Sequence, residues 1–179
     1  MATKTLITVE EFLRLPEPMD AIQELVEGEV VTLPYTVPLH NLVRDKILVL
    51  LITFVESGRL GTVVSRQAFH LPGNTVRIPD VSFVRIGRNL PPNELPEGAP
   101  NLVIEVVSPT DTAHEMHRRI SDFFAAGSMR VWVVYPEERE VYVHGLAGVL
   151  RRRGDDLLED QELLPGFSVK VSSLFEQTA

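Results

Sequence analysis

The chain has 179 residues, with 17 basic and 25 acidic side chains and a formal net charge of −8. This length allows one domain, and 44% hydrophobic residues can bury a core, so disordered and fibrous classes are excluded. The absence of cysteine excludes disulfide scaffolds, thiolate zinc sites, iron–sulfur clusters and cysteine nucleophiles. The acidic balance argues against non-specific coating of nucleic acid, because neutralising phosphates needs a concentrated basic face.

No segment has the pattern of a membrane span or a signal peptide. The longest apolar run, residues 47–55, is far shorter than the roughly 20 residues of a spanning helix. Glu10 and Glu11 come before any apolar stretch of signal-peptide length. We therefore expect a cytoplasmic protein without a membrane partner.

The first half of the chain predicts two helices and several short strands. Thr8 and Glu11 have the spacing of a capping box, ahead of a short helix over about 8–15. Glu27-Gly28 suggests a tight turn or bulge within a hairpin over 24–33. Apolar residues at three-and-four spacing predict an amphipathic helix over 39–57 that ends at Gly58. Four short strands that look like a β-meander are then expected at 62–64, 68–71, 76–78 and 81–84.

The second half predicts a β-α-β unit. A proline-rich surface loop over 89–100 leads to a buried strand over 102–107, a helix over 113–126 and a second buried strand over 131–135. An antiparallel strand over 141–144 should join one edge, before a last strand and a short closing helix. We expect a single domain over 1–179, with its core over about 20–145 and the C-terminal strands and closing helix over about 146–176.

Glu105 is the anomaly of the sequence, because it is the one charged residue in the apolar run LVIEVV. A buried carboxylate is costly unless it is paired, hydrogen-bonded or bound to a metal. Asp80, which follows Pro79 at the start of a strand, is the natural partner. Two carboxylates and a main-chain carbonyl would make an open magnesium site, completed by water and a phosphate oxygen. The alternative is that Asp80 is an ordinary turn residue after proline.

The order of parts resembles the PD-(D/E)XK superfamily of restriction-endonuclease-like nucleases. The parts are a Glu in an early segment (Glu24 of ELVEGE), a helix, a Pro-Asp pair, a buried strand with IEV and a helix with a basic residue. The chain is more closely similar to the Uma-type family, a large group of uncharacterised bacterial proteins described as restriction endonucleases. The segments that match are ELVEGEVV, the helix led by His40, VRIPDVSFV, LVIEVVSPTD, FFAAGSMRVWVVYPEEREVYVH and LPGF.

This resemblance covers nearly the whole chain and implies an α/β, restriction-endonuclease-like fold with a central mixed β-sheet flanked by helices. It implies that Asp80, Glu105 and the main-chain carbonyl of Val106 hold Mg²⁺ or Mn²⁺, and that Glu24 is an accessory acid. It also implies DNA as the substrate and a homodimer whose two sites face two strands.

The family's lysine is missing from both of its usual positions. Val107 stands two residues after the second acid, and Arg119 stands eight residues before the glycine of the AAG block. A lysine there can hold or polarise the attacking water, whereas an arginine stays charged and cannot act as a base. Arg119 can still stabilise the charge that develops on the phosphate.

Smaller hypotheses concern accessory residues. Ser108 matches the family's serine and could hydrogen-bond the site, although a Ser-Pro helix entry explains it equally well. Gln67 and Arg66 lie on a strand near the expected cleft, where either could contact a phosphate. The remaining candidates have simpler interpretations. His40 opens its helix, and His114 with His117 is not needed as a metal pair because the carboxylates already suffice. Trp132, Phe123 and Phe124 are read as core packing, and Arg151 to Arg153 as a solvated strand end.

These observations support three function hypotheses. The first is a magnesium-dependent nuclease that acts on DNA. The second is a binding or regulatory protein that keeps the nuclease fold but has weakened or lost cleavage, as Arg119 and the acidic charge favour. The third is an enzyme for a small phosphorylated or nucleotide substrate. The sequence has no Gly-rich phosphate loop, HExxH or GxSxG motif, so kinase, zincin and α/β-hydrolase chemistries have no support.

Overall fold

The computed structural model of the chain describes residues 6–16, 18, 21–33, 36–88 and 90–176. In these ranges the helical elements are α1 (Val9–Phe12), α2 (Pro38–Gly58), α3 (Ala113–Ala125) and the 3-10 turn η1 (Val171–Leu174). The strands are β1 (Ile22–Val26), β2 (Glu29–Leu33), β3 (Gly61–Ser65), β4 (Phe69–Leu71), β5 (Thr75–Arg77), β6 (Val81–Arg85), β7 (Leu102–Val106), β8 (Arg130–Tyr135), β9 (Glu140–Gly145), β10 (Gly148–Arg153), β11 (Leu157–Asp160) and β12 (Leu164–Lys170).

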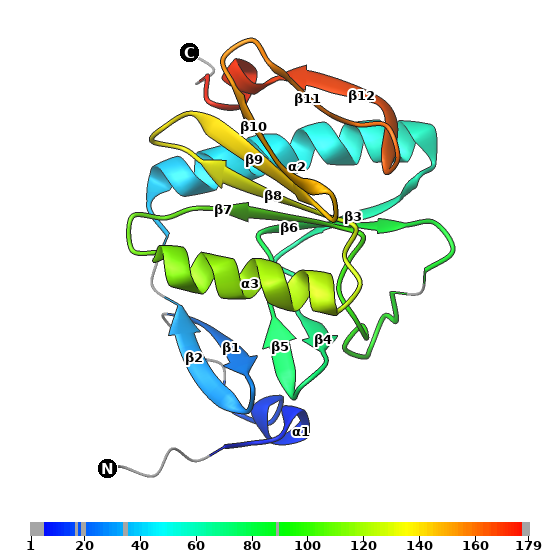
Figure 1. The fold of residues 1–179 in the computed structure, drawn as a ribbon. Helices are drawn as coiled ribbons and strands as arrows, with labels where there is room; N and C mark the ends of the chain where they lie inside the picture. Colours follow the sequence, from blue (N-terminus) through cyan, green and yellow to red (C-terminus); the bar gives the residue numbers. More distant parts are fainter. Residues whose placement is uncertain (1–5, 17, 19–20, 34–35, 89, 177–179) are drawn as a thin grey trace.

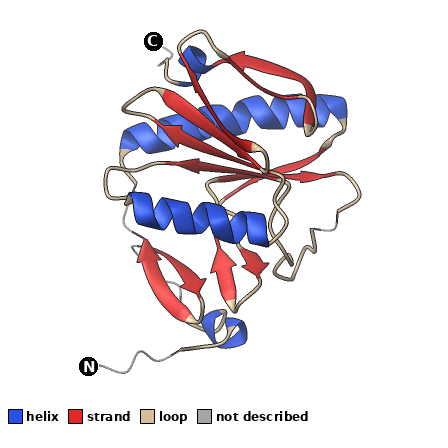
Figure 2. Ribbon diagram, viewed as in Figure 1, coloured by secondary structure: helices blue, strands red, loops and turns tan. Residues whose placement is uncertain are grey.

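A mixed sheet of six strands forms the centre of the fold, in the order β10-β9-β8-β7-β6-β3. β7 and β8 run parallel, and the other neighbours in this sheet are antiparallel. Helix α2 covers one face of the sheet and helix α3 covers the other (Figures 1 and 2). A smaller sheet in the order β2-β1-β5-β4 lies beyond α3, and the β11–β12 hairpin lies near α2 at the opposite end. The structure is therefore a mixed α/β fold with helices on both faces of its central sheet.

Alternating residues of β7 divide the core between the two helices. Ile104 packs in one apolar cluster with Ile47 and Leu51 of α2. Val103 packs in a second cluster with Phe123 of α3. Because side chains alternate along a strand, Glu105 falls on the same face as Val103 and points toward α3. This alternation explains how a carboxylate comes to lie inside an otherwise apolar strand.

The prediction that aromatic residues serve as packing is confirmed for the two that are fully buried. Trp132 and Phe123 are each 0% exposed, and Trp132 stacks on Phe167 with ring centroids 6.2 Å apart. Phe124 is partly buried against the α3-side cluster. The rings of Trp132 and Phe123 are therefore not available to a base.

The helices agree with their sequence signals. Thr8 and Glu11 make the predicted capping box of α1, and Thr112 with Glu115 makes a second one at α3. Helix α2 ends at Gly58, as predicted, and the residue that caps it is Arg59 in the left-handed conformation, with φ of 51°. The hairpin prediction is confirmed, since β1 and β2 pair antiparallel around Glu27 and Gly28.

The β-meander prediction is wrong. β3 pairs with its neighbour β6 at one edge of the central sheet. The β4–β5 hairpin, which lies between them in the sequence, belongs to the smaller sheet and pairs with β1. Leu25 of β1 pairs with Val76 of β5, and both side chains are fully buried. Burial of these residues beneath α3 decides the pairing, and this long-range contact has no local signal in the sequence.

The β-α-β unit is confirmed by the parallel pairing of β7 and β8 on either side of α3. Strand β9 does join antiparallel, but β10 pairs beyond it and is the edge strand. In the proline-rich loop Asn89 lies outside the described residues, while Ala99 is fully buried rather than at the surface. Among the described helices, none is long and apolar enough to cross a membrane.

Candidate functional site

One pocket gathers most of the residues singled out from the sequence. Asp80, Glu105, Val106, Ser108 and Arg119 all line it, and its volume is about 60 Å³. Helix α2 and the β1–β2 hairpin complete its walls with His40, Ile22 and Leu33. The pocket therefore lies where both sheets and both long helices converge.

Strand register brings the two predicted carboxylates to facing positions. β6 and β7 are antiparallel, with Val81 opposite Ile104. Continuing this register by one residue sets Asp80 opposite Glu105. Opposed residues on one face of an antiparallel pair have their Cβ atoms about 4.5–5.5 Å apart. The predicted partnership of Asp80 with Glu105 thus agrees with the geometry of the sheet.

Asp80 is fixed in place by hydrogen bonds on its side chain and its main chain. Its Oδ2 accepts from the backbone N–H of Val106 at 2.9 Å and lies 3.1 Å from Nε2 of His40. Its backbone carbonyl accepts from the Ser65 hydroxyl and from the Arg66 N–H. No hydrogen bond to Oδ1 is found within the described residues. One oxygen of this carboxylate is therefore oriented by the protein while the other remains available to a ligand.

Glu105 is paired with Arg119. Nη2 of Arg119 donates to Oε1 of Glu105 at 2.8 Å and to Oε2 at 3.0 Å. Glu105 is 4% exposed and Arg119 is 9% exposed. A carboxylate has about four lone-pair sites, so these two contacts leave Glu105 with acceptor capacity.

Glu24 pairs with Arg119 and does not line the pocket. Its Oε2 accepts from Nη1 of Arg119 at 2.7 Å and from Nη1 of Arg77 at 2.8 Å. Its Oε1 accepts from the backbone N–H of Ile78 at 2.8 Å. Glu24 is fully buried, so its accepted hydrogen bonds make it an anchor for two arginines.

Sequence reasoning missed Arg77. This residue is 4% exposed, and its Nη2 also lies 2.5 Å from Oδ2 of Asp122 on α3. Its signal was a charged residue within the short strand TVR, the same kind of anomaly that identified Glu105. The buried charges therefore form a network of Arg77, Arg119, Glu24 and Glu105, with Asp122 at its edge.

The pKa values of two members of this network, Glu105 and Arg119, are raised. Burial raises the pKa of Glu105 to about 8, with a further increase from the negative charges of Asp80 and Glu24, against the lowering effect of Arg119. Burial alone would lower the pKa of Arg119, but its two carboxylate partners outweigh that effect and raise it. Arg119 is therefore a permanent cation and cannot serve as a proton acceptor.

Two buried polar atoms of the pocket have no hydrogen-bond partner among the described residues. They are Nδ1 of His40 and Oγ of Ser108. Buried polar atoms in native proteins are nearly always satisfied by protein, water or ligand. The backbone N–H of Ser108 donates to Oδ2 of Asp111 at 2.7 Å, so the backbone that carries this hydroxyl is held in a turn. These two atoms mark the pocket as polar enough to hold a ligand.

The pocket meets the requirements of a magnesium ion in donor type. Within the described part of the chain, no three His, Cys, Asp or Glu side chains are grouped to hold a metal ion. Mg²⁺ is commonly bound through only one or two carboxylates, with waters and substrate phosphates filling the remaining positions. Asp80 and Glu105 supply that pair of carboxylates, each with unused acceptor capacity.

The remaining candidates lie in different places. Arg66 lines the pocket, whereas Gln67 does not and donates to the carbonyl of Ala68 at 2.9 Å. His114 and His117 are exposed on α3 and do not line the pocket. His40 lies near the start of α2, as expected, but its contact with Asp80 was not predicted.

A family model described as "Uma2: Putative restriction endonuclease" matches residues 9–172 of the chain. The crystal structure of a putative nuclease belonging to DUF820 from Anabaena variabilis is similar in fold, with a TM-score of 0.83 over 94% of this chain and 97% of that one. The two sequences are 22% identical, so this likeness concerns the fold alone. None of the curated proteins matches the chain at a significant level.

Proposed function

The chain belongs to the Uma2 family of putative restriction endonucleases, and on this premise we propose that it is a metal-dependent endonuclease that hydrolyses phosphodiester bonds in DNA. The observation that carries the proposal is the pair of carboxylates, Asp80 and Glu105, at facing positions of β6 and β7 in one polar pocket. The proposal includes a restriction-endonuclease-like fold in a single domain over 1–179.

In this proposal Asp80, Glu105 and the main-chain carbonyl of Val106 hold Mg²⁺ or Mn²⁺. A divalent ion supplies a water of lowered pKa and neutralises charge on the phosphate. Oδ2 of Asp80 is already committed to His40 and to the Val106 N–H, which leaves Oδ1 to face the ion. The two hydrogen bonds to Oδ2 therefore orient the Asp80 carboxylate before any ligand binds.

Arg119 and Ser108 are the residues that would act on the phosphate. Arg119 remains positively charged at every accessible pH, so it stabilises negative charge that develops on the phosphate oxygens. The Ser108 hydroxyl has no acceptor in the described chain and can donate to one of those oxygens. Glu24 takes no direct part, because its oxygens are occupied by Arg77, Arg119 and the Ile78 N–H.

A homodimer is the assembly that suits this activity. Each protomer has one such pocket, and cutting both strands of a duplex requires two pockets that face two phosphodiester backbones. A dimer related by two-fold symmetry would supply them, because the two strands of DNA are themselves related by two-fold axes.

Plasmid cleavage tests the proposal. Supercoiled plasmid and circular single-stranded DNA are incubated with Mg²⁺ or Mn²⁺ and the parent, Asp80→Asn, Glu105→Gln or Asp155→Asn. Asp155 is an exposed aspartate that pairs with Lys170, so its variant is the matched control. We expect the parent and Asp155→Asn to nick or cut, and the two pocket variants to lose activity by at least tenfold. Cleavage by Asp80→Asn at the parent rate would contradict the assigned site.

The second candidate function is a DNA-binding or regulatory protein with weakened cleavage. Arg119 favours it, because Nη2 of this arginine contacts both oxygens of Glu105 where the family usually has a lysine. Under this alternative the parent binds DNA without cutting it, and Arg119→Lys gains activity. If both proteins cut equally well, the weakened-enzyme alternative is wrong.

A further inference from the structure

A second pocket adjoins the candidate site. Its volume is about 370 Å³, within the range of ligand pockets, which is roughly 300–1,000 Å³. It shares Ile22, Arg66 and Ile78 with the first pocket, so the two are neighbours. Its walls come from α1 and the residues that follow it, and from the beginning of β1.

The walls of this second pocket are apolar and not fully covered. Leu13 and Leu15 both line it and are 57% and 41% exposed. Phe12 and Ile22 add an aromatic ring and an aliphatic surface, and Gln23 adds one amide. Apolar walls with few polar groups are typical of ligand pockets, and an aromatic ring such as that of Phe12 can stack on a nucleic-acid base.

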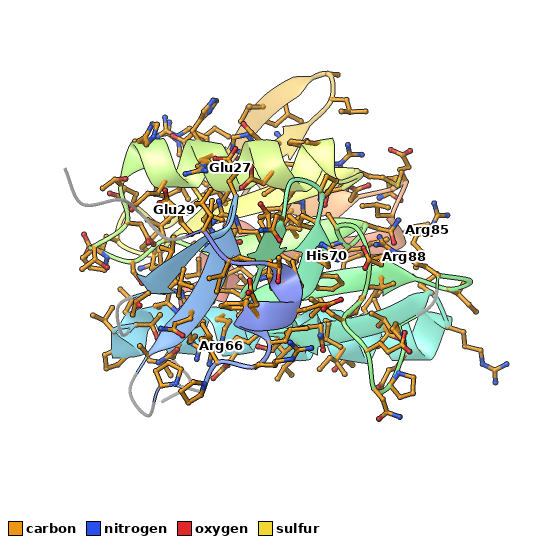
Figure 3. All side chains as sticks on the ribbon, turned by 90° about the horizontal axis from the view of Figure 1, so that it is seen from below. Glu27, Glu29, Arg66, His70, Arg85 and Arg88 are labelled. Atoms are coloured by element: carbon orange, nitrogen blue, oxygen red, sulfur yellow. The ribbon has the colours of Figure 1, made fainter. Side chains whose placement is uncertain are left out.

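Arg66 stands at the boundary of the two pockets. Figure 3 views the molecule from the side of α1 and labels Arg66 beside that helix, and the residue lines both pockets. Its left-handed backbone, with φ of 51°, is tied to the carbonyl of Asp80 by its own N–H. The direction of this side chain is thus coupled to a residue of the candidate site.

The guanidinium of Arg66 has no acidic partner within 4 Å in the described part of the chain. Its one side-chain hydrogen bond there is a long one, 3.4 Å from Nη2 to the Thr36 hydroxyl. Burial and the nearby positive charge of Arg44 lower the pKa of Arg66, while the negative charges of Asp80 and Asp45 act in the opposite direction. A guanidinium with a single long hydrogen bond keeps donors that can bind an anion such as a phosphate.

We propose that Arg66 binds a backbone phosphate adjacent to the one cleaved, and that the second pocket receives an unpaired base of the same strand. The substrate is then single-stranded DNA, or duplex DNA whose strands separate at the cut. In a duplex the bases are stacked inside and cannot enter an apolar pocket without leaving the stack. This inference rests on the proposed function, because it takes the first pocket as the place of cleavage.

Equilibrium binding in the presence of EDTA tests the inference without any cleavage. Fluorescence anisotropy compares labelled single-stranded and duplex DNA of equal length. Arg66→Asn removes the charge and keeps a residue that tolerates the left-handed conformation. Its control is Arg59→Asn, since Arg59 has the same φ of 51° and caps the far end of α2, about 28 Å from His40 at 1.5 Å per residue.

The second pocket has a matched control as well. The double variant Leu13→Ser with Leu15→Ser removes two exposed leucines from the pocket wall. The control, Leu146→Ser with Leu150→Ser, removes two leucines that are 88% and 55% exposed on the β9–β10 hairpin. Circular dichroism and thermal unfolding establish that each variant is folded before binding is compared.

We expect the parent to bind single-stranded DNA at least tenfold more tightly than duplex. Arg66→Asn should weaken single-strand binding by about tenfold and reduce the slope of log K against log salt by about 0.7, the value for one lost phosphate contact on a single strand. The pocket double variant should weaken single-strand binding by about tenfold, as expected for one lost base contact, and leave duplex binding unchanged.

The inference is overturned if Arg66→Asn binds as Arg59→Asn does, or if the pocket double variant weakens both forms of DNA equally. Cleavage is scored separately and distinguishes the two proposals. A parent that cuts plasmid while these variants bind normally keeps the proposed function and loses this inference. A parent that binds single strands through Arg66 and the second pocket but cuts nothing keeps this inference and loses the proposed function.

Discussion

Arg119 contacts both oxygens of Glu105 through a single nitrogen, Nη2, while its Nη1 is held by Glu24. The guanidinium therefore occupies the side of the Glu105 carboxylate that faces α3. Any divalent ion that binds Glu105 must share this carboxylate with a permanent positive charge. In the proposed metal site, this competition would set the metal affinity together with the number of ligands.

Replacing Arg119 with lysine should strengthen metal binding and weaken the fold. A lysine has a single ammonium group and cannot reach Glu24 and Glu105 with the planar fork of arginine. Loss of one charge-assisted hydrogen bond lowers the free energy of unfolding by about 1–3 kcal/mol. Isothermal titration with Mn²⁺ should show an affinity several-fold higher than that of the parent, and urea unfolding should give the stability.

Arg118→Lys is the matched control for this change. Arg118 is the preceding residue on α3 and pairs with Glu27 at the surface, where 42% of its side chain is exposed. We expect parent-like metal affinity and stability from it. If Arg119→Lys also binds Mn²⁺ as the parent does, the competition described above is wrong.

Local patterns in the sequence were sufficient for the elements whose apolar residues are regularly spaced or contiguous. The apolar spacing of α2 and the apolar runs of β7 and β8 predicted these elements to within a few residues. The same patterns failed for the β4–β5 hairpin, since its partner β1 is about 50 residues away and is selected by burial of Leu25 against Val76. Pairing at that separation depends on tertiary packing, which no local pattern records.

Glu24 is predicted to act as a structural anchor, so its loss should unfold the protein more readily. Glu24→Gln removes the charge that neutralises two buried arginines, Arg77 and Arg119. Breaking a buried ion pair by removing one partner costs about 3–5 kcal/mol. Urea unfolding should show a fall of this size in the free energy of unfolding.

The same hairpin supplies the control for Glu24. Glu27→Gln breaks the surface pair with Arg118, in which 75% of the Glu27 side chain is exposed. Exposed pairs contribute less than about 1 kcal/mol, so this variant should unfold almost as the parent does. Equal losses from Glu24→Gln and Glu27→Gln would show that the buried network is no more important than a surface pair.

The candidate site was predictable in its carboxylates but not in its counterions. Asp80 and Glu105 were identifiable because a charge in a buried strand needs an explanation. The roles of Arg77 and Glu24 depend on the small sheet packing beneath α3, which brings residues some 50 positions apart into one network. For the same reason, the contact between His40 and Asp80 follows from where α2 crosses the central sheet.

Glu105 should make the stability of the metal-free protein depend on pH. Burial raises its pKa to about 8 in the folded state, against 4.5 for the unconstrained side chain. Between pH 4.5 and 8 the Glu105 side chain holds a proton in the folded state that it has lost in the unfolded state. The stability that this proton contributes is therefore complete below pH 4.5 and is lost as the pH rises through 8. Urea unfolding in EDTA should therefore show stability falling with pH over this window.

Glu105→Gln cannot titrate, so the same measurement on this variant isolates the effect. Its free energy of unfolding should change less between pH 4.5 and 8 than that of the parent. A parent and a variant with the same slope would mean that Glu105 is ionised in the folded protein throughout this window.

His40 should act on the reaction through Asp80. Nε2 of His40 lies 3.1 Å from Oδ2 of Asp80, while Oδ1 has no hydrogen-bond partner among the described residues. Partners that orient a metal-binding group commonly affect metal affinity or activity by about 10- to 100-fold. His40→Ala should lower Mn²⁺ affinity within this range, and His40→Gln should restore part of it because the glutamine amide can still donate to Asp80. His70→Ala is the control, since His70 also pairs with a carboxylate, Glu97 at 2.8 Å, but at a partly exposed surface. If the role of His40 is merely structural, His40→Gln and His40→Ala should both lose stability, and their Mn²⁺ affinity per folded molecule should stay at the parent value. Mn²⁺ affinity and urea unfolding measured on the same samples therefore decide between the two roles.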